Sequence, residues 1–393
     1  MSDAILVLNA GSSSLKFAVF GCGGDDAAIL RGKIAGIGRA PVFSAIRPDG
    51  TAPDAGVLGD IPADADHEAL VSLLLDWLAQ RRGERRLVAV GHRVVHGGRG
   101  FDAPVRIDEA VLDALEALVP LAPLHQPHNL AAIRAVAERQ PGLPQVACFD
   151  TSFHRTQDPL AQQFALPRAL TDEGVIRYGF HGLSYDYIAG ILPQHLGARA
   201  EGRVIVAHLG NGASMCALNG RKSVATSMGF TALDGLMMGR RCGALDAGVV
   251  LYLMQSKGLS AAEVETLLYR QSGLLGVSGI SNNMRDLEQS GAAQARDAIA
   301  LYCYRAASIL GGLVAVNGGL DALVFTAGIG ENSALVRGLI CERLGWLGVE
   351  LNDAGNAANA SRISSDRSKV DVLVLPTDEE TVIARAAGAM VAP

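Results

Sequence analysis

The segment that decides the fold is Ile5-Leu-Val-Leu-Asn-Ala-Gly-Ser-Ser-Ser-Leu-Lys-Phe-Ala-Val-Phe20, near the start of the chain. Its two apolar runs are typical of buried β-strands, and the Gly-Ser-Ser-Ser between them indicates a tight polar turn. The same pattern recurs at Val204-Ile-Val-Ala-His-Leu-Gly-Asn-Gly-Ala-Ser-Met-Cys-Ala-Leu218. One unit used twice predicts two similar α/β lobes, although chance can also make two such segments alike.

Further strand and helix patterns surround these two segments. Strands are expected at 87–90, 145–149, 322–325 and 370–375, and helices at 68–82, 108–118, 129–140, 245–257, 260–271 and 292–316. The helix at 260–271 begins with a capping box formed by Ser260 and Glu263, and residues 376–380 are expected to cap a final helix. Strands that alternate with helices indicate the α/β class.

The composition favours a globular protein with two cores, because single cores rarely exceed roughly 250–300 residues. The chain has 393 residues, of which 49% are hydrophobic, and a net charge of −6. Its densest basic run, Arg81-Arg-Gly-Glu-Arg-Arg86, contains an acid and is interpreted as a solvated helix end, not a nucleic-acid patch. Neither a signal peptide nor a membrane-spanning run is expected. The six scattered cysteines favour free thiols in a reducing cytoplasm.

Three glycine-rich turns follow buried strands, at 11–14, 210–212 and 328–330. Glycine lets backbone N–H groups approach phosphate oxygens closely, and such turns can form anion-binding nests. Each turn alone is more typical of an ordinary hairpin. Three of them in a chain without a GxxxxGK[ST] motif favour a nucleotide site that is not a P-loop.

The motifs also resemble one known family, the acetate kinases, across nearly the whole chain. Their order and spacing agree with that family at Asn9–Lys16, His92–Gly98, Leu121–His125, Phe149–Thr151, Tyr178–Gly182, His208–Gly212, Thr226–Phe230, Leu236–Gly239 and Thr326–Asn332. The resemblance implies two duplicated actin-like ATPase (ribonuclease H-like) lobes, each βββαβαβα, with the active site in the interlobe cleft. It places the acyl substrate and Mg²⁺ on residues 1–150 plus 381–393, and the nucleotide on residues 151–380.

The activity that this resemblance implies is the reversible phosphorylation of acetate to acetyl phosphate by direct in-line transfer. ATP and ADP would be the co-substrates, Mg²⁺ the metal (with Mn²⁺ as a substitute), and the protein a cytoplasmic homodimer that binds no nucleic acid and no membrane. A propionate or butyrate kinase would differ only in its acyl pocket. A nucleotide-dependent binding protein of the same superfamily is the alternative from another class, and the residues matched to the acyl pocket disfavour it.

The resemblance assigns catalytic roles to five residues. Arg93 and Arg241 would hold the γ-phosphoryl group, whose negative charge suits arginine forks. His181 would donate a hydrogen bond to the same oxygens, and His125 would assist. Asp150 has an acid/base role in the family. The carboxylic acid substrate, with a pKa of about 4.3, is already an anion near neutrality, so it has no proton for Asp150 to remove. We therefore expect Asp150 to hold metal-bound water or to orient Arg93.

The binding residues follow from the same motifs. The metal would be bound by Asn9 and Glu379, although Glu379 can also be interpreted as a helix cap. The phosphates would be bound by Ser12, Ser14, Lys16, His208, Leu209, Gly210, Asn211 and Gly212. The adenosine would be bound by Asn283, Met284, Arg285, Gly328, Ile329, Gly330, Glu331 and Asn332. The acyl pocket would be lined by Arg93, Val95, Leu124, Phe180 and Ala232.

Several positions depart from the family pattern. Arg240 and Ala244 replace a threonine and an aspartate beside Arg241, which makes the local potential more positive. Ala232 stands where proline is common, which leaves room for a longer substrate unless Met237 or Met238 fills it. Further departures are Leu183, Tyr185, Ala225, Gln126, Asn283 and Asp378. They leave the choice between acetate and propionate open.

Overall fold

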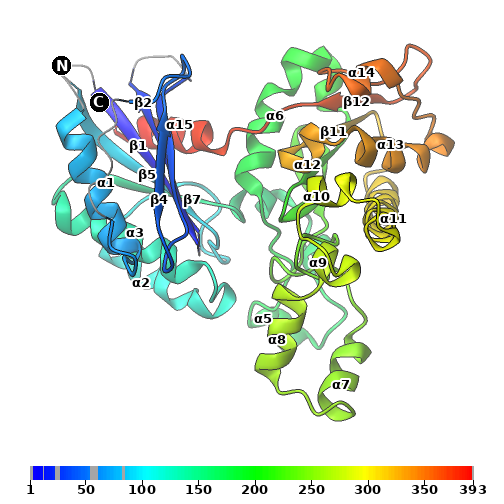
Figure 1. Cartoon of the computed structure of the whole chain (residues 1–393), viewed down its shortest axis with the longest axis horizontal. Coiled ribbons are helices and arrows are strands. Elements are labelled where there is room, and N and C mark those ends of the chain that lie inside the picture. The colour runs from blue at the N-terminus through cyan, green and yellow to red at the C-terminus, as the bar shows by residue number, and fades with distance from the viewer. Residues whose placement is uncertain (1–2, 12, 23–26, 54–60, 82–84, 392–393) are drawn as a thin grey trace. The chain divides into compact units, whose positions relative to one another are not determined.

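The chain forms two compact units in a computed structural model that describes residues 3–11, 13–22, 27–53, 61–81 and 85–391 (Figure 1). Unit 1 comprises Met1–Phe153 and Asp378–Pro393, and unit 2 comprises His154–Thr377. The polypeptide therefore leaves unit 1, builds the whole of unit 2 and returns to unit 1 for its last helix.

Unit 1 is built on a mixed sheet of seven strands in the order β4-β3-β2-β1-β5-β7-β6. The strands are β1 (Asp3–Gly11), β2 (Ser14–Gly21), β3 (Ala28–Ala35), β4 (Val42–Ile46), β5 (Arg86–Val94), β6 (Val105–Arg106) and β7 (Gln145–Phe149). β1 to β4 are antiparallel neighbours, whereas β1, β5 and β7 run parallel. The carboxyl ends of β1, β5 and β7 consequently meet at one edge of the sheet.

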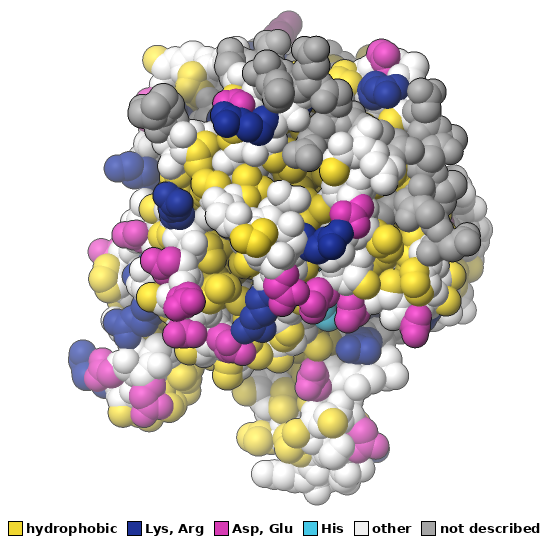
Figure 2. Space-filling view, turned by 90° about the vertical axis from the view of Figure 1, so that its left-hand side faces the viewer, with side chains coloured by type: hydrophobic (Ala, Val, Ile, Leu, Met, Phe, Trp, Pro, Cys, Tyr) yellow, Lys and Arg dark blue, Asp and Glu magenta, His cyan; other side chains and the backbone are white. Residues whose placement is uncertain are grey.

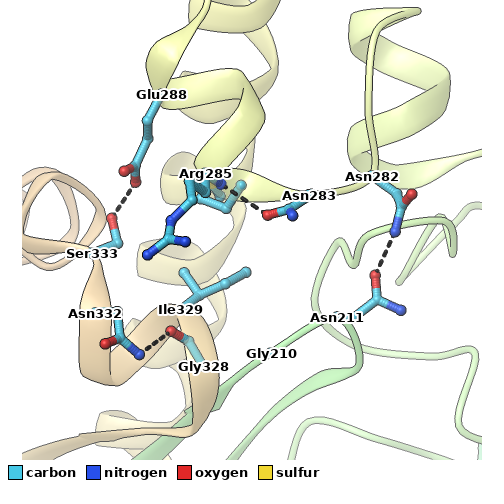
Figure 3. Close-up of a pocket in the computed structure, with 11 residues that line it drawn as sticks. Gly210, Asn211, Asn282, Asn283, Arg285, Glu288, Gly328, Ile329, Asn332 and Ser333 are labelled. Carbon is cyan, nitrogen blue, oxygen red and sulfur yellow. Dashed lines mark hydrogen bonds between the residues drawn. The ribbon is translucent and has the colours of Figure 1, made fainter. Parts of the chain in front are cut away.

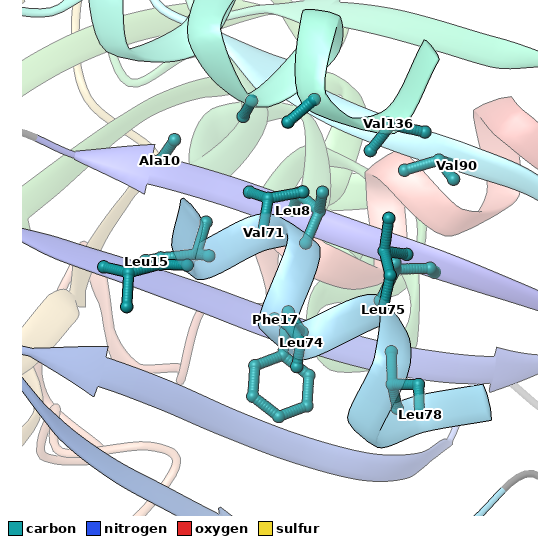
Figure 4. Close-up of a cluster of buried hydrophobic side chains, with 14 of the residues drawn as sticks. Leu8, Ala10, Leu15, Phe17, Val71, Leu74, Leu75, Leu78, Val90 and Val136 are labelled. Carbon is teal, nitrogen blue, oxygen red and sulfur yellow. The ribbon is translucent and has the colours of Figure 1, made fainter. Parts of the chain in front are cut away.

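Helices cover both faces of this sheet. They are α1 (His67–Arg81), α2 (Glu109–Ala117), α3 (Gln126–Arg139) and α15 (Glu379–Val391). The 3₁₀ helix η1 (Val119–Leu121) follows α2, and the 3₁₀ helix η2 (Ser152–Thr156) includes the last residues of unit 1 before unit 2 begins. On one face, Leu8, Phe17, Leu74 and Val136 belong to a buried cluster formed by β1, β2, α1 and α3 (Figure 4). On the other face α15 packs closely, because a Cβ on Gly91 of β5 would lie 2.4 Å from the Ile383 side chain. The α15 helix therefore completes the fold of unit 1.

Unit 2 repeats the central part of this sheet. Its strands are β8 (Arg203–Leu209), β9 (Ala213–Asn219), β10 (Lys222–Thr226), β11 (Ala322–Thr326) and β12 (Asp371–Val374), in the order β10-β9-β8-β11-β12. β8 pairs antiparallel with β9 and parallel with β11, as β1 does with β2 and β5. The order matches β3-β2-β1-β5-β7 of unit 1, so the repeat expected from the two strand–turn–strand segments is confirmed. Unit 1 adds β4 and β6 to this common core.

The helices of unit 2 either precede β8 or lie in the two long connections of the sheet, between β10 and β11 and between β11 and β12. They are α4 (Pro159–Gln162), α5 (Arg168–Asp172), α6 (Gly182–Leu196), η3 (Gly197–Glu201), α7 (Ala247–Gln255), α8 (Ala261–Arg270), α9 (Gly273–Ser278), α10 (Met284–Gln289), α11 (Ala293–Val316), α12 (Ala327–Asn332), α13 (Ala334–Glu342), η4 (Gly345–Leu347) and α14 (Asp353–Ala357). The capping box predicted at Ser260 is confirmed, with both reciprocal hydrogen bonds present. The glycine-rich segment after β11, expected to be a turn, instead forms the short helix α12.

The helix α11 is long and apolar enough to cross a membrane by length and composition, although no such run was expected from the sequence. A helix in the core of a globular protein passes the same test, and one such helix is weak evidence. Within unit 2, α11 buries Ile299, Tyr302 and Leu310, and it packs against α9, α10 and α13. Its apolar composition is therefore explained at least in part by packing within unit 2.

The charged side chains of the described surface are mixed in sign. On the face drawn in Figure 2, Lys and Arg side chains lie singly among Asp, Glu and apolar side chains. Several cations of the described surface are paired, for example Arg139 with Asp76, Arg134 with Glu116, and Arg86 with Asp3. Exposed pairs of this kind contribute about 0–1 kcal/mol to stability, so their main effect is on the electrostatic potential of the surface.

Candidate functional site

Four predicted site residues of unit 1 lie together at the carboxyl ends of its parallel strands. Asn9 is on β1, Arg93 is on β5, Asp150 follows β7, and Glu379 is the first residue of α15. The Arg93 guanidinium donates two hydrogen bonds to Asp150, from Nε to Oδ1 at 2.8 Å and from Nη2 to Oδ2 at 2.7 Å. Its Nη1 lies 3.4 Å from Glu379 Oε2 and 3.5 Å from Asn9 Oδ1. The arginine is thus oriented by an oxygen acceptor on each side.

This cluster is largely withdrawn from water. The side chains of Arg93, Asp150 and Glu379 are 19%, 3% and 16% exposed. Burial alone would lower the pKa of Arg93, but the charges of Asp150 and Glu379 outweigh burial and hold that pKa above its ordinary value. Burial raises the pKa of Glu379, and Asp150 raises it further, while Arg93 opposes both. A second cation close to Glu379 would therefore be favourable.

Two residues that the sequence analysis did not select support the strand ends beside this cluster. Asn129 on α3 accepts from the Val95 backbone N–H at 3.0 Å and donates to the Ala10 carbonyl at 2.8 Å, so it ties β5 to β1. The His67 ring donates through Nε2 to the Gly11 carbonyl at 2.7 Å. Lys16 is the cross-strand partner of Asn9 in the β1–β2 hairpin. Neither Asn129 nor His67 stands in a motif, so only their contacts identify them.

The remaining predicted residues of unit 1 lie on neighbouring segments. Val95 follows β5, Leu124 and His125 lie in the turn before α3, and all three are half-buried. Ser14 begins β2 and pairs with Gly11. Ser12 lies outside the described residues.

In unit 2, a stacked pair of histidines lies beside the Gly210–Gly212 turn. The rings of His181 and His208 are 4.2 Å apart and nearly parallel. His181 Nδ1 lies 2.8 Å from Ser214 Oγ, which also contacts the Tyr185 hydroxyl, and His208 Nδ1 lies 2.8 Å from Ser184 Oγ. His181 adopts a left-handed conformation with φ 58°, which non-glycine residues rarely adopt and which is common at functional sites.

Arg241 lies beside the same turn. A Cβ built on Gly212 would lie 3.5 Å from His181 Nε2 and 3.9 Å from Arg241 Nη1, so both side chains approach this glycine. Arg241 Nη1 donates to the Ala232 carbonyl at 2.8 Å and lies 3.7 Å from Met238 Sδ. Burial lowers the pKa of Arg241, and within the described part of the chain no ion pair joins it to a carboxylate. Such a desolvated guanidinium is suited to binding an anion.

A pocket of about 510 Å³ opens next to this turn (Figure 3). It is lined by Gly210, Asn211, Asn282, Asn283, Met284, Arg285, Glu288, Gly328, Ile329, Asn332 and Ser333. Most of the residues predicted to bind adenosine are among them. Asn282, Glu288 and Ser333 are additions that the sequence analysis missed, because they flank the motifs instead of belonging to them.

Gly330 and Glu331 were also predicted to bind adenosine, but they are not among the described residues that line this pocket. The Glu331 carboxylate instead accepts from the Ala327 N–H at 2.8 Å and from the Thr377 N–H at 3.3 Å. Ala327 has φ 65°, and this hydrogen bond holds it at the start of α12. Glu331 thus supports the backbone of the glycine-rich segment.

The oxygen donors in unit 1 suit a metal that keeps most of its water. No group of three or more His, Cys, Asp and Glu side chains is arranged to hold a metal in the parts of the chain that are described. Asn9 Oδ1 and Glu379 Oε2 nevertheless lie near each other, because both are within 3.5 Å of Arg93 Nη1. Mg²⁺ prefers oxygen ligands, retains several waters and also binds substrate phosphates, so two protein ligands are sufficient.

Comparison with known proteins agrees with these features. The profile of the Acetokinase family matches residues 4–385. The chain belongs to this family. The acetate kinase of Rhodopseudomonas palustris (strain ATCC BAA-98 / CGA009) is 54% identical over 391 residues, covering 98% of each chain. That of Rhizobium meliloti is 50% identical, covering 98% of this chain and 97% of the other.

Solved structures of the same family have the same fold. A propionate kinase from Francisella tularensis subsp. tularensis SCHU S4 has a TM-score of 0.91 at 35% identity, covering 98% of this chain and 99% of the other. The Porphyromonas gingivalis acetate kinase has a TM-score of 0.87 at 36% identity, covering 99% and 100%. Together with the repeated strand order, these matches confirm the predicted α/β class with duplicated actin-like lobes.

Proposed function

We propose that this chain is an acetate kinase that transfers the γ-phosphoryl group of ATP to acetate, reversibly, to give acetyl phosphate and ADP. The observation that carries the proposal is Arg241, a desolvated arginine without a carboxylate partner among the described residues, beside His181 and a glycine turn in a chain of the acetokinase family. This combination is suited to an anion whose charge changes during reaction. The acetate kinases of high identity support the choice of substrate.

The reaction balances without a protein base. A carboxylate oxygen of acetate forms the new bond to the γ-phosphorus, and the bond to the β–γ bridging oxygen breaks, with its electrons leaving on ADP. Because acetate is already an anion near neutrality, no proton has to be removed. The protein's task is therefore to position the reactants and to stabilise the charge on the transferring group.

The described side chains can divide this task as follows. Arg93, held by Asp150, would bind the substrate anion, and Arg241 would stabilise the transferring phosphoryl oxygens. If Ser214 donates to His181 Nδ1, then Nε2 carries the ring proton and points it toward the Gly212 backbone, where a phosphoryl oxygen can accept it. When bound, Mg²⁺ would be held by Asn9 and Glu379 and would neutralise phosphate charge.

A hydroxamate assay tests the proposal directly. The purified chain is incubated with ATP, Mg²⁺ and hydroxylamine, with and without acetate, and both ADP and acyl hydroxamate are measured. We expect equal amounts of the two products, and only when acetate is present. ADP formation that is independent of any carboxylate would contradict the proposal and favour the nucleotide-dependent binding protein instead.

Propionate should be used nearly as well as acetate. Ala232 replaces a proline and thereby removes roughly two carbons of volume, and burial of one methylene contributes about 0.8 kcal/mol. We expect kcat/KM for propionate to be within about tenfold of that for acetate, because one methylene is discriminated by only about 1–3 kcal/mol. Met238 is fully buried and contacts the same Arg241 nitrogen as the Ala232 carbonyl, so it is the side chain best placed to fill the space instead.

The measurement is kcat/KM for acetate, propionate and butyrate in the wild type and in Ala232→Pro. The proline variant should shift the ratio toward acetate. A disturbance of Arg241 would lower all three values together, so only the ratio reports on the pocket. An unchanged ratio would show that residue 232 does not set its depth.

The homodimer inferred from the family resemblance is supported by α7. This helix has the sequence Ala-Gly-Val-Val-Leu-Tyr-Leu-Met-Gln, and every residue in it is exposed or half-buried. Leu251 and Tyr252 are 55% and 51% exposed. An apolar helix surface of this kind is typical of an interface between subunits, and most homo-oligomers are symmetric dimers. We propose that α7 lies in the dimer interface of a cytoplasmic enzyme whose six cysteines are free.

Light scattering coupled to size exclusion tests this proposal. The wild type should have twice the mass of one 40.9 kDa chain, and Leu251→Asp should shift it toward one chain. Leu160→Asp, at an apolar residue on α4 that is 80% exposed, is the control and should leave the mass unchanged. A monomeric wild type, or a Leu251→Asp variant that remains dimeric, would contradict the assignment of α7.

A further inference from the structure

The pocket of unit 2 contains a carboxylate that the proposed chemistry does not use. Glu288 is the single carboxylate among its described lining residues, and Arg285, on the same helix α10, is the single cation. Nucleotide phosphates carry several negative charges, so a carboxylate next to them would be repelled. Glu288 must therefore face a neutral part of the nucleotide if the pocket is occupied.

The carboxylate is held in place by a buried serine. The Ser333 hydroxyl donates to Glu288 Oε1 (Figure 3). It also accepts from the Val336 backbone N–H at 3.0 Å. Ser333 is 5% exposed and caps the N-terminus of α13, so its hydroxyl proton has a defined direction. An ionised carboxylate accepts about four hydrogen bonds and donates none. The bond from Ser333 uses one of these positions, which leaves Glu288 oriented and able to accept more.

A structural explanation of Glu288 also exists. A negative charge near the N-terminus of α13 stabilises that helix by about 0.3–1 kcal/mol, whether or not a ligand binds. This explanation accounts for the contact with Ser333 but not for the place of Glu288 in the wall of a 510 Å³ pocket. The two explanations differ in what they predict for ligand selectivity, which makes them separable.

The chemistry of a nucleoside indicates which part Glu288 meets. The ribose carries two adjacent hydroxyl donors, whereas the adenine edge alternates acceptors with one amino group. Two carboxylate oxygens match adjacent hydroxyls, as in dinucleotide-binding folds where an acidic residue holds the ribose. Ile329 and Met284 supply the apolar surface that a base requires. We propose that Glu288, oriented by Ser333, accepts hydrogen bonds from the ribose hydroxyls and makes the site selective for ribonucleotides.

The proposal rests on the proposed function only in that a nucleotide occupies this pocket. Two measurements on the full-length chain test it. The first is kcat/KM in the acetate assay for ATP, 2′-deoxy-ATP and 3′-deoxy-ATP. The second is calorimetric binding of ADP and of its two deoxy analogues. Hydrogen bonds to charged groups are strong enough that the wild type should prefer the ribonucleotide to at least one deoxy analogue by about tenfold or more.

Glu288→Ala should bring that preference close to unity, mainly by weakening ribonucleotide binding. Glu288→Gln keeps one acceptor and should give an intermediate ratio, and Ser333→Ala, which frees the carboxylate, should lower the ratio less than Glu288→Ala does. Asp286→Asn is the matched control, because it removes one negative charge from the same helix at an exposed residue outside the pocket lining. It should retain the wild-type ratio.

Any other result would overturn the assignment of Glu288 to the ribose hydroxyls. A wild type that does not discriminate between the sugars would refute it, and so would an unchanged ratio in Glu288→Ala. If the variant instead loses its preference for ATP over GTP, the carboxylate faces the base. Failure of the proposed function is distinguishable, because a chain without acetate-dependent ADP formation could still show the ribose preference in calorimetry.

Discussion

Replacing Arg241 with alanine is expected to lower kcat by 10²-fold or more while leaving the stability of the protein nearly unchanged. The loss in rate reflects about 3 kcal/mol of transition-state stabilisation, the usual contribution of one well-placed donor to a developing charge. The stability should be preserved because burial lowers the pKa of Arg241 and no described carboxylate compensates its charge. Removing a half-buried charge that has no charged partner does not strand another charge.

The measurements are kcat at saturating ATP and acetate, and the midpoint of thermal unfolding. Arg241→Lys should recover only part of the activity, because an ammonium cannot reproduce the guanidinium fork. Arg296→Ala, at an exposed arginine near the start of α11, is the control and should behave like the wild type. Wild-type turnover in Arg241→Ala would remove this residue from the reaction.

Replacing Arg93 with alanine is expected to have a different signature, with losses in both turnover and stability. Turnover should again fall by 10²-fold or more. In addition, the variant leaves Asp150, which is 3% exposed, and Glu379 without their cation. Breaking a buried pair by removing one partner costs about 3–5 kcal/mol, and we expect about 3 kcal/mol because Arg93 retains some contact with water.

A double-mutant cycle separates the two effects. Asp150→Asn keeps the size of the side chain and removes the charge, so the unfolding penalty of Arg93→Ala should be clearly smaller in the Asp150→Asn background. The same variant tests the role of Asp150. If Asp150 positions Arg93, the acidic limb of the kcat profile should persist in Asp150→Asn, whereas a limb that disappears would indicate a proton-transfer role. Additive stability effects would show that the fork observed here contributes little.

These two arginines also show what sequence reasoning could and could not provide. Motifs and the charge of a phosphoryl group predict a catalytic role for both. Their different environments were not foreseeable, because Arg93 forms an ion pair with Asp150 across 57 residues of chain, whereas the hydrogen-bond partners of Arg241 among the described residues are a carbonyl and a thioether. The contrasting stability predictions therefore come from the structure alone.

The sequence by itself determined the features that depend on near neighbours in the chain. The apolar runs around Gly11 and Gly210 predicted the two duplicated sheets, and the capping box at Ser260 predicted the start of α8. Such patterns are reliable because strand alternation and capping involve residues at most a few positions apart. The motifs likewise include most residues that line the pocket of unit 2.

Only the tertiary structure decided the contacts between distant segments. The segment after β11 forms the helix α12 where a turn was expected, and Glu331 supports its backbone. Glu288 and Ser333, which are 45 residues apart in the chain, form a hydrogen bond. The tertiary structure also assembled Asn9, Arg93, Asp150 and Glu379, because sheet order places the carboxyl ends of β1, β5 and β7 side by side and α15 returns to pack against them. The physical reason is that strand order and helix packing follow from burial of the whole core, which no local pattern encodes.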